Sequence, residues 1–246
     1  TEQAQRARLA ALNVSGSSRA LSQRMAKAYC QQHLQVMPLA ALDVLAKVRK
    51  QAQAGAADLA KGSTAGAWPA DLSRQLEEVQ KQYTVLNTLT ATAPSKASAA
   101  AVAEQADRMM TAAQTATESL EKLARARSAK LVNLAGRQRM LSQRMAKQYF
   151  LLAAGVDPKA SQTQMNADAA EFKQALQALA AAPVSTPAIR TELELGQAQW
   201  LFFEAAMRRH PDTKGMEAVA TTSERLLEVM DRLTSLYDAA LREVLG

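Results

Sequence analysis

Residues 13–29 read NVSGSSRALSQRMAKAY, and residues 133–149 read NLAGRQRMLSQRMAKQY. Eleven of these seventeen positions are identical at an offset of 120 residues, which indicates an internal duplication of nearly the whole chain. A repeat that is kept only for packing can lose its polar surface. Here the identical positions are mostly polar, and the pattern therefore predicts a functional site present twice. They include Asn13/Asn133, Gly16/Gly136, Arg19/Arg139, Ser22/Ser142, Gln23/Gln143, Arg24/Arg144 and Lys27/Lys147.

Both copies of this motif lie in stretches that lack acidic residues. Residues 3–42 and 122–156 contain no Asp or Glu, although they hold 13 of the 30 Lys and Arg residues. The net charge of +7 is therefore mostly local. A positive field without compensation favours binding of an anion. A solvated basic helix face is the alternative interpretation.

The composition predicts an all-α protein. Strong helix formers dominate, whereas the 246 residues include only 9 Gly, 7 Pro and 4% aromatic residues. No apolar run reaches the roughly 18 residues that a membrane span requires, so we expect no span in this chain. Cys30 is the single cysteine, which excludes an intrachain disulfide. Cys30 and His33 alone cannot complete a zinc site, and we expect neither a metal nor a cofactor.

The positions of helix-breaking residues along the chain predict four helices in each repeat. Pro38 and Pro158 keep the offset of 120 and suit the first turn of a helix, predicted at 39–60 and 159–181. The third helix has apolar residues at helical spacing in both copies, and a fourth helix follows. We therefore expect two four-helix modules, residues 1–127 and 128–246. The spaced residues of the third helix are Leu72, Leu76, Val79, Tyr83 and Leu86, then Ile189, Leu193, Gly196, Trp200, Phe203 and Met207.

The join between the modules lacks any loop signal. Gly136 is the only breaker between Ala97 and Gly155. We therefore expect one continuous helix from about Ala99 to Leu152, with the two bundles stacked end to end as a rod. The alternative is a hinge near 133–136 that places the motif helices side by side and builds one shared site from Arg24 and Arg144.

The motif itself suggests how an anion is held. On a helix of about 100° per residue, Gly16, Ala20 and Arg24 share one face, as do Gly136, Met140 and Arg144. A guanidinium at such a close helix seam needs an acceptor, either an acid or a bound anion. Its planar fork suits nitrate, nitrite or a carboxylate. Arg19 and Arg139 lie about 140° away, and we expect them to pair mainly with acids of neighbouring helices.

The pattern N-x-x-G-x-x-R-x-x-S-Q-R-x-A resembles the N-terminal sensory domain of the PilJ family and the P-box of NarX-type nitrate/nitrite sensor kinases. The second copy, Gly136 to Ala146, fits closely, whereas the first has Ala20 where the pattern usually has Met. The resemblance implies a four-helix bundle in a sensor that is periplasmic or otherwise extracytoplasmic. It also implies a small anion between two motif helices, held by the later Arg and by backbone near the Gly. Those positions are Arg24 with Gly16, and Arg144 with Gly136.

We therefore expect a sensory protein or receptor ectodomain that binds a small anion, with a homodimer or a membrane signalling partner as further expectations. The candidate ligand-binding residues are Arg144, Gly136, Arg24, Gly16, Arg139, Arg19, Asn133, Ser142 and Gln143. The alternative is a structural or interaction protein whose arginines only hold helices together. The chain has no nucleophile–base constellation and no phosphate loop, so we expect no enzyme. It also lacks a nucleic-acid reading head. Ser17, Ser18 and Ala20, against Arg137, Gln138 and Met140, predict two unequal copies.

Overall fold

The computed structural model describes residues 2–64, 68–124 and 127–245, and these residues form eight helices and no strand. The all-α prediction is confirmed. The helices are α1 (Glu2–Leu34), α2 (Pro38–Thr64), α3 (Ala70–Thr90), α4 (Lys96–Ala124), α5 (Arg127–Ala154), α6 (Pro158–Ala180), α7 (Pro187–Met207) and α8 (Thr213–Leu245).

The turns that follow the two motif helices have the same construction. Pro38 and Pro158 are the first residues of α2 and α6, as predicted. Before them, the N–H of Val36 donates to the carbonyl of Gln31, and that of Val156 donates to Leu151, both at 2.9 Å. The backbone is left-handed at Gln35 (φ 57°) and at its counterpart Gly155 (φ 75°). Glycine adopts this conformation without strain, so only the second copy has the favourable residue.

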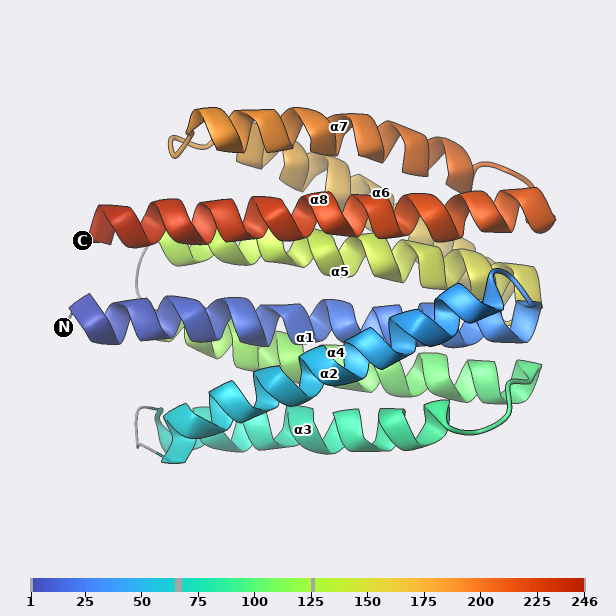
Figure 1. The fold of residues 1–246 in the computed structure, drawn as a ribbon, viewed down its shortest axis with the longest axis horizontal. Helices are drawn as coiled ribbons and strands as arrows, with labels where there is room; N and C mark the ends of the chain where they lie inside the picture. The colour runs from blue at the N-terminus through green and yellow to red at the C-terminus, as the bar shows by residue number, and fades with distance from the viewer. Residues whose placement is uncertain (1, 65–67, 125–126, 246) are drawn as a thin grey trace.

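Each half of the chain forms a set of neighbouring helices. In the first helix set (α1–α4), α1 packs against α2 and α4, and α3 packs against α4. In the second helix set (α5–α8), α5 packs against α6 and α8, and α7 packs against α8. The sets meet where α1 and α5 lie side by side along their length (Figure 1). The two motif copies are therefore adjacent.

The predicted continuous helix from Ala99 to Leu152, and with it the end-to-end rod, is wrong. Helix α4 ends at Ala124 and α5 begins at Arg127, and the two run in opposite directions (Figure 1). Three antiparallel contacts show this reversal: Glu121 with Asn133, Gln114 with Arg137, and Asp107 with Lys147. The predicted hinge at 133–136 is also misplaced, because those residues lie within α5. Residues 125 and 126, between the helices, lie outside the described part.

Buried lysines explain why the halves lie side by side. Lys27 in α1 and Lys147 in α5 are both 0% exposed. Lys27 Nζ lies 2.6 Å from Glu224 of α8, and Lys147 Nζ lies 2.5 Å from Asp107 of α4. Each lysine thus reaches an acid of the other helix set. An end-to-end rod would separate these partners and leave two buried ammonium groups without acids, which is strongly unfavourable.

Candidate functional site

Two glycines and two arginines lie together where α1 contacts α5. We call Gly16, Arg19, Gly136 and Arg139 the glycine–arginine cluster. A Cβ atom at Gly16 would lie 3.0 Å from Arg19 Nη2 and 3.6 Å from Arg139 Nη2. A Cβ atom at Gly136 would lie 2.9 Å from Arg139 Nη2 and 3.7 Å from Arg19 Nη2. Both guanidinium groups therefore occupy space that the two glycines leave open.

The two arginines are held in the same way by their own helices. Arg19 Nε donates to the carbonyl of Gly16, and Arg139 Nε donates to that of Gly136, both at 3.1 Å. Arg19 Nη1 donates to Gln114 Oε1 of α4 at 2.8 Å. Arg139 Nη1 lies 3.5 Å from Asp231 of α8, whose side chain is half exposed. Arg139 Nη2 also makes a long contact, 3.4 Å, with the carbonyl of Asn13 across the seam.

The charges of this cluster are incompletely compensated. Arg19 and Arg139 are 0% and 6% exposed. Arg19 Nη2 is buried and has no hydrogen-bond partner among the described residues. Burial, reinforced by the positive charges of Arg139 and Arg137, lowers the pKa of Arg19 to about 9. Burial also lowers the pKa of Arg139, although Asp231 opposes it. Two buried cations side by side with an unused donor form an arrangement that an anion would stabilise.

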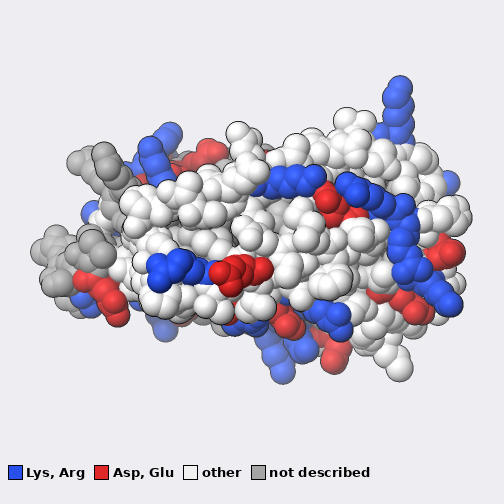
Figure 2. All heavy atoms as spheres, turned by 90° about the horizontal axis from the view of Figure 1, so that it is seen from above, with Lys and Arg blue, Asp and Glu red and all other residues white. Residues whose placement is uncertain are grey.

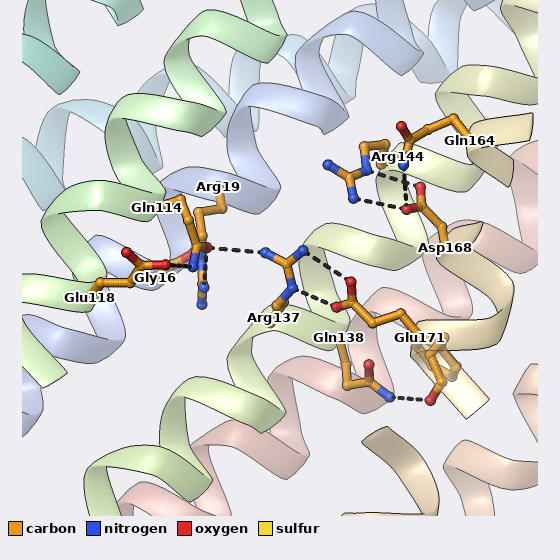
Figure 3. Close-up of polar contacts among 11 residues, drawn as sticks. Gly16, Arg19, Gln114, Glu118, Arg137, Gln138, Arg144, Gln164, Asp168 and Glu171 are labelled. Atoms are coloured by element: carbon orange, nitrogen blue, oxygen red, sulfur yellow. Dashed lines mark hydrogen bonds and ion pairs between the residues drawn. The ribbon is translucent and has the colours of Figure 1, made fainter. Parts of the chain in front are cut away.

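Arg24 and Arg144, by contrast, each donate to both oxygens of an acid. Arg144 donates through Nε and Nη2 to both oxygens of Asp168 at 2.9 and 2.8 Å, and Asp168 also accepts from Gln164 (Figure 3). Arg24 donates to both oxygens of Glu224 at 3.3 and 2.6 Å. The lack of Asp and Glu in residues 3–42 and 122–156 therefore does not leave these arginines unpaired, because both acids come from other helices. This pairing is what the helix-holding alternative anticipates.

Side-chain direction explains why the earlier arginine of each motif lies beside the glycine. Side chains on an α-helix tilt toward its N-terminus, so a residue covers the turn that precedes its own Cα. Arg19 therefore extends back over Gly16, and Arg139 over Gly136. A helical wheel shows only the angle around the axis and omits this tilt. Even by that angle, Gly16 lies nearer to Arg19 (about 60°) than to Arg24 (about 80°), so the predicted grouping of Gly16 with Arg24 was wrong.

The remaining candidates support the motif helices. Ser142 Oγ donates to the carbonyl of Arg139 at 2.7 Å, and its counterpart Ser22 does the same to Arg19. Gln143 Nε2 donates to Ser142 Oγ and to the carbonyl of Ser223 on α8. Asn133 Nδ2 donates to Glu121 at 2.6 Å. These contacts orient the arginine-bearing backbone and join it to neighbouring helices.

Two polar residues near the cluster were not singled out from the sequence. Gln114 Oε1 accepts from both Arg19 and Arg137, and Arg137 also forms an ion pair with Glu171 (Figure 3). Gln114 lies on α4, outside the repeated motif, so no local pattern marks it. Arg137 was noted only as a difference between the copies. Together they link the cluster to α6.

One of the residues considered as possible metal ligands is Cys30. Cys30 is fully buried, and burial raises the pKa of its thiol to about 12. Among the described residues, no group of three or more His, Cys, Asp or Glu side chains could hold a metal ion. On the face seen in Figure 2, basic side chains run together toward the right end, and acidic side chains lie beside several of the basic ones.

Residues 123–226 match the PilJ family model. This family is described as the Type IV pili methyl-accepting chemotaxis transducer N-term. The matched residues contain the second motif copy, and the match supports a PilJ-type sensory domain there. Such a domain suggests a signalling function. The PilJ family is a sensory family and not a catalytic one. Comparison with curated proteins and with solved structures gives no match. None of the described helices is both long and apolar enough to cross a membrane.

Proposed function

We propose that this protein is a sensory domain that binds a small planar anion, such as nitrate, nitrite or a small carboxylate, between its two motif helices. The observation that carries the proposal is the glycine–arginine cluster, with its two buried guanidinium groups and the unused Nη2 donor of Arg19. An anion there would gain charge-assisted hydrogen bonds and would remove the repulsion between the two cations.

This proposal gives the arginines different functions from those expected from the motif alone. Arg19 and Arg139 contact the anion, and Gly16 and Gly136 leave the room that their guanidinium groups occupy. Arg24 and Arg144 hold α8 and α6 in place through Glu224 and Asp168. This proposal explains why the motif occurs twice, because each motif helix supplies one half of a single site. Two copies of the chain are not needed to bring the two motifs together.

The wider interpretation follows from the PilJ match and the repeated turns. We interpret the two helix sets as tandem four-helix modules, the first a diverged copy of the PilJ-like second, with a more distant relation to NarX-type sensors. A periplasmic location and a membrane-bound signalling partner are part of the same proposal. The alternative is an interaction protein whose buried ion pairs only hold helices together. It is favoured by the acid partners of Arg24, Lys27, Arg144 and Lys147.

A thermal-shift titration of the full chain separates the two functions. Sodium nitrate, nitrite and acetate are compared with sodium chloride at equal, low ionic strength, since a ligand that binds only the native state raises Tm. We expect the rise in wild type and its loss in Arg19→Met and Arg139→Met. Arg108→Gln, on the exposed side of α4, is the control and keeps the rise. If none of the three anions stabilises wild type, the helix-holding alternative stands.

A further inference from the structure

A cavity lies within the first helix set, and none of the four residues of the glycine–arginine cluster lines it. Its volume is about 300 Å³. All four helices contribute to its wall: Ser15 and Ser18 from α1, Ala52 and Ala56 from α2, Leu76, Val79 and Tyr83 from α3, and Met109 from α4. Most of the wall surface is apolar. No Lys or Arg lines it, and Glu77 is the charged side chain among the remaining wall residues, which are Leu59, Ala60, Ser63, Ser73, Glu77 and Gln80. This cavity is therefore chemically unlike the anion site.

At three matching positions the second helix set has larger side chains than the cavity wall. The offset of 120 residues aligns Ala52 with Phe172 and Ala56 with Leu176, both of which are buried. The matching spacing of α3 and α7 aligns Tyr83 with Trp200. Phe172 stacks on Trp200, with ring centroids 4.6 Å apart and an angle of 22° between the planes. The cavity thus exists because small residues in the first copy occupy the positions of a packed aromatic core in the second.

The hydroxyl oxygen of Tyr83 is the buried polar atom of the cavity wall that lacks a hydrogen-bond partner among the described residues. Tyr83 is 5% exposed, and its hydroxyl makes no hydrogen bond with any described residue. Ser15, also in the wall, is satisfied by Thr117 of α4 at 3.0 Å. A buried phenol hydroxyl normally finds an acceptor, because losing water without replacement is unfavourable. The unpaired Tyr83 hydroxyl therefore indicates a ligand atom that accepts a hydrogen bond.

We propose that this cavity binds a small, uncharged, mainly apolar molecule with one hydrogen-bond-accepting oxygen, of the size of a substituted benzene ring. Apolar cavities of about 150 Å³ already hold benzene, so the larger volume here accommodates a ring with a side group. The absence of basic side chains from the wall excludes the anion of the proposed function as the occupant. The Tyr83 hydroxyl donates a hydrogen bond to the ligand oxygen, while Ala52 and Ala56 leave room for the ring.

Acetophenone and α-methylstyrene form a matched pair of probes, because they have the same shape and differ by a carbonyl oxygen in place of a methylene group. Calorimetric or ligand-observed NMR titration of the full chain measures both. We expect acetophenone to bind wild type about five- to tenfold more tightly than α-methylstyrene, as one hydrogen bond implies. In Tyr83→Phe this preference disappears, because only the hydroxyl is removed.

A matched pair of substitutions on α2 tests the location. Ala56→Leu introduces the residue of the second copy into the cavity, whereas Ala57→Leu makes the same change on the exposed face. We expect Ala56→Leu to weaken acetophenone binding at least tenfold and Ala57→Leu to leave it unchanged. Circular dichroism verifies that both variants fold, and Ala52→Phe gives a second filled cavity. The proposal is overturned if neither probe binds wild type, or if the filled variants bind acetophenone as wild type does.

Discussion

The pairing of Lys27 and Arg24 with Glu224 makes a quantitative prediction for Glu224→Gln. Burial disfavours the ionised carboxylate, but Lys27 and Arg24 outweigh burial and lower the pKa of Glu224 to about 2. The difference from its ordinary value of 4.5 corresponds to about 3 kcal/mol of native-state stabilisation. The Glu224 side chain is 28% exposed, and Lys27 is left fully buried when the acid is removed. Loss of one partner of a buried pair costs a similar amount, about 3–5 kcal/mol.

We therefore expect Glu224→Gln to lower the free energy of unfolding by about 3 kcal/mol, which corresponds to about 6–12 °C in Tm for a chain of this size. Urea denaturation and calorimetry at neutral pH measure this loss. Glu228→Gln, one turn further along α8 at an exposed position, is the matched control and leaves stability unchanged within about 0.5 kcal/mol. The double variant Lys27→Met/Glu224→Gln recovers at least about half of the loss, because the buried ammonium is removed as well.

The same pair predicts an acid-dependent loss of stability. A carboxylate with a lowered pKa in the folded state stabilises that state fully above the unfolded value of 4.5. This contribution disappears as the pH falls from about 4.5 toward 2. In Glu224→Gln the corresponding dependence of the free energy of unfolding on pH is absent. Wild-type stability in the single variant, or a double variant no more stable than the single one, would refute the assigned pairing.

Three further changes test the seam and its neighbours. Gly136→Ala places a Cβ atom 2.9 Å from Arg139 Nη2, and we expect calorimetry to show nitrate affinity reduced at least tenfold; unchanged affinity would contradict the site. Asp231→Asn removes the acid that competes for Arg139, and the same titration is expected to show tighter nitrate binding, by up to about fivefold. Arg144→Ala leaves Asp168, which is 1% exposed, without its cation. Urea denaturation should then show a loss of about 3–5 kcal/mol, with nitrate affinity retained in the folded fraction.

Local patterns in the sequence were sufficient to predict the helices. Leu72, Leu76, Val79, Tyr83 and Leu86 are buried along α3, as their spacing predicted. The proline positions located the start of α2 and α6 because proline fixes its own backbone angle wherever it lies. Helical spacing and proline geometry act over a few residues and are therefore visible in a single sequence.

The reversal between α4 and α5 could not be predicted from local signals. No glycine or proline lies between Ala124 and Arg127, and the surrounding residues favour helix. The reversal is favoured by distant groups, since Lys27 and Lys147 reach acids 197 and 40 residues away only when α1 and α5 are adjacent. Tertiary contacts of this kind outweigh intrinsic helix propensity, which amounts to less than about 1 kcal/mol per residue.

The sequence by itself determined that this chain is helical and that a motif rich in polar residues recurs in it at an offset of 120 residues. Only the tertiary structure decided which arginine of the motif lies at the seam. The acids that pair with Arg24 and Arg144 come from α8 and α6, and the backward tilt of helical side chains brings Arg19 and Arg139 over the two glycines. Charge compensation acts through space and not along the chain, so an acid-free stretch of sequence does not define an acid-free site.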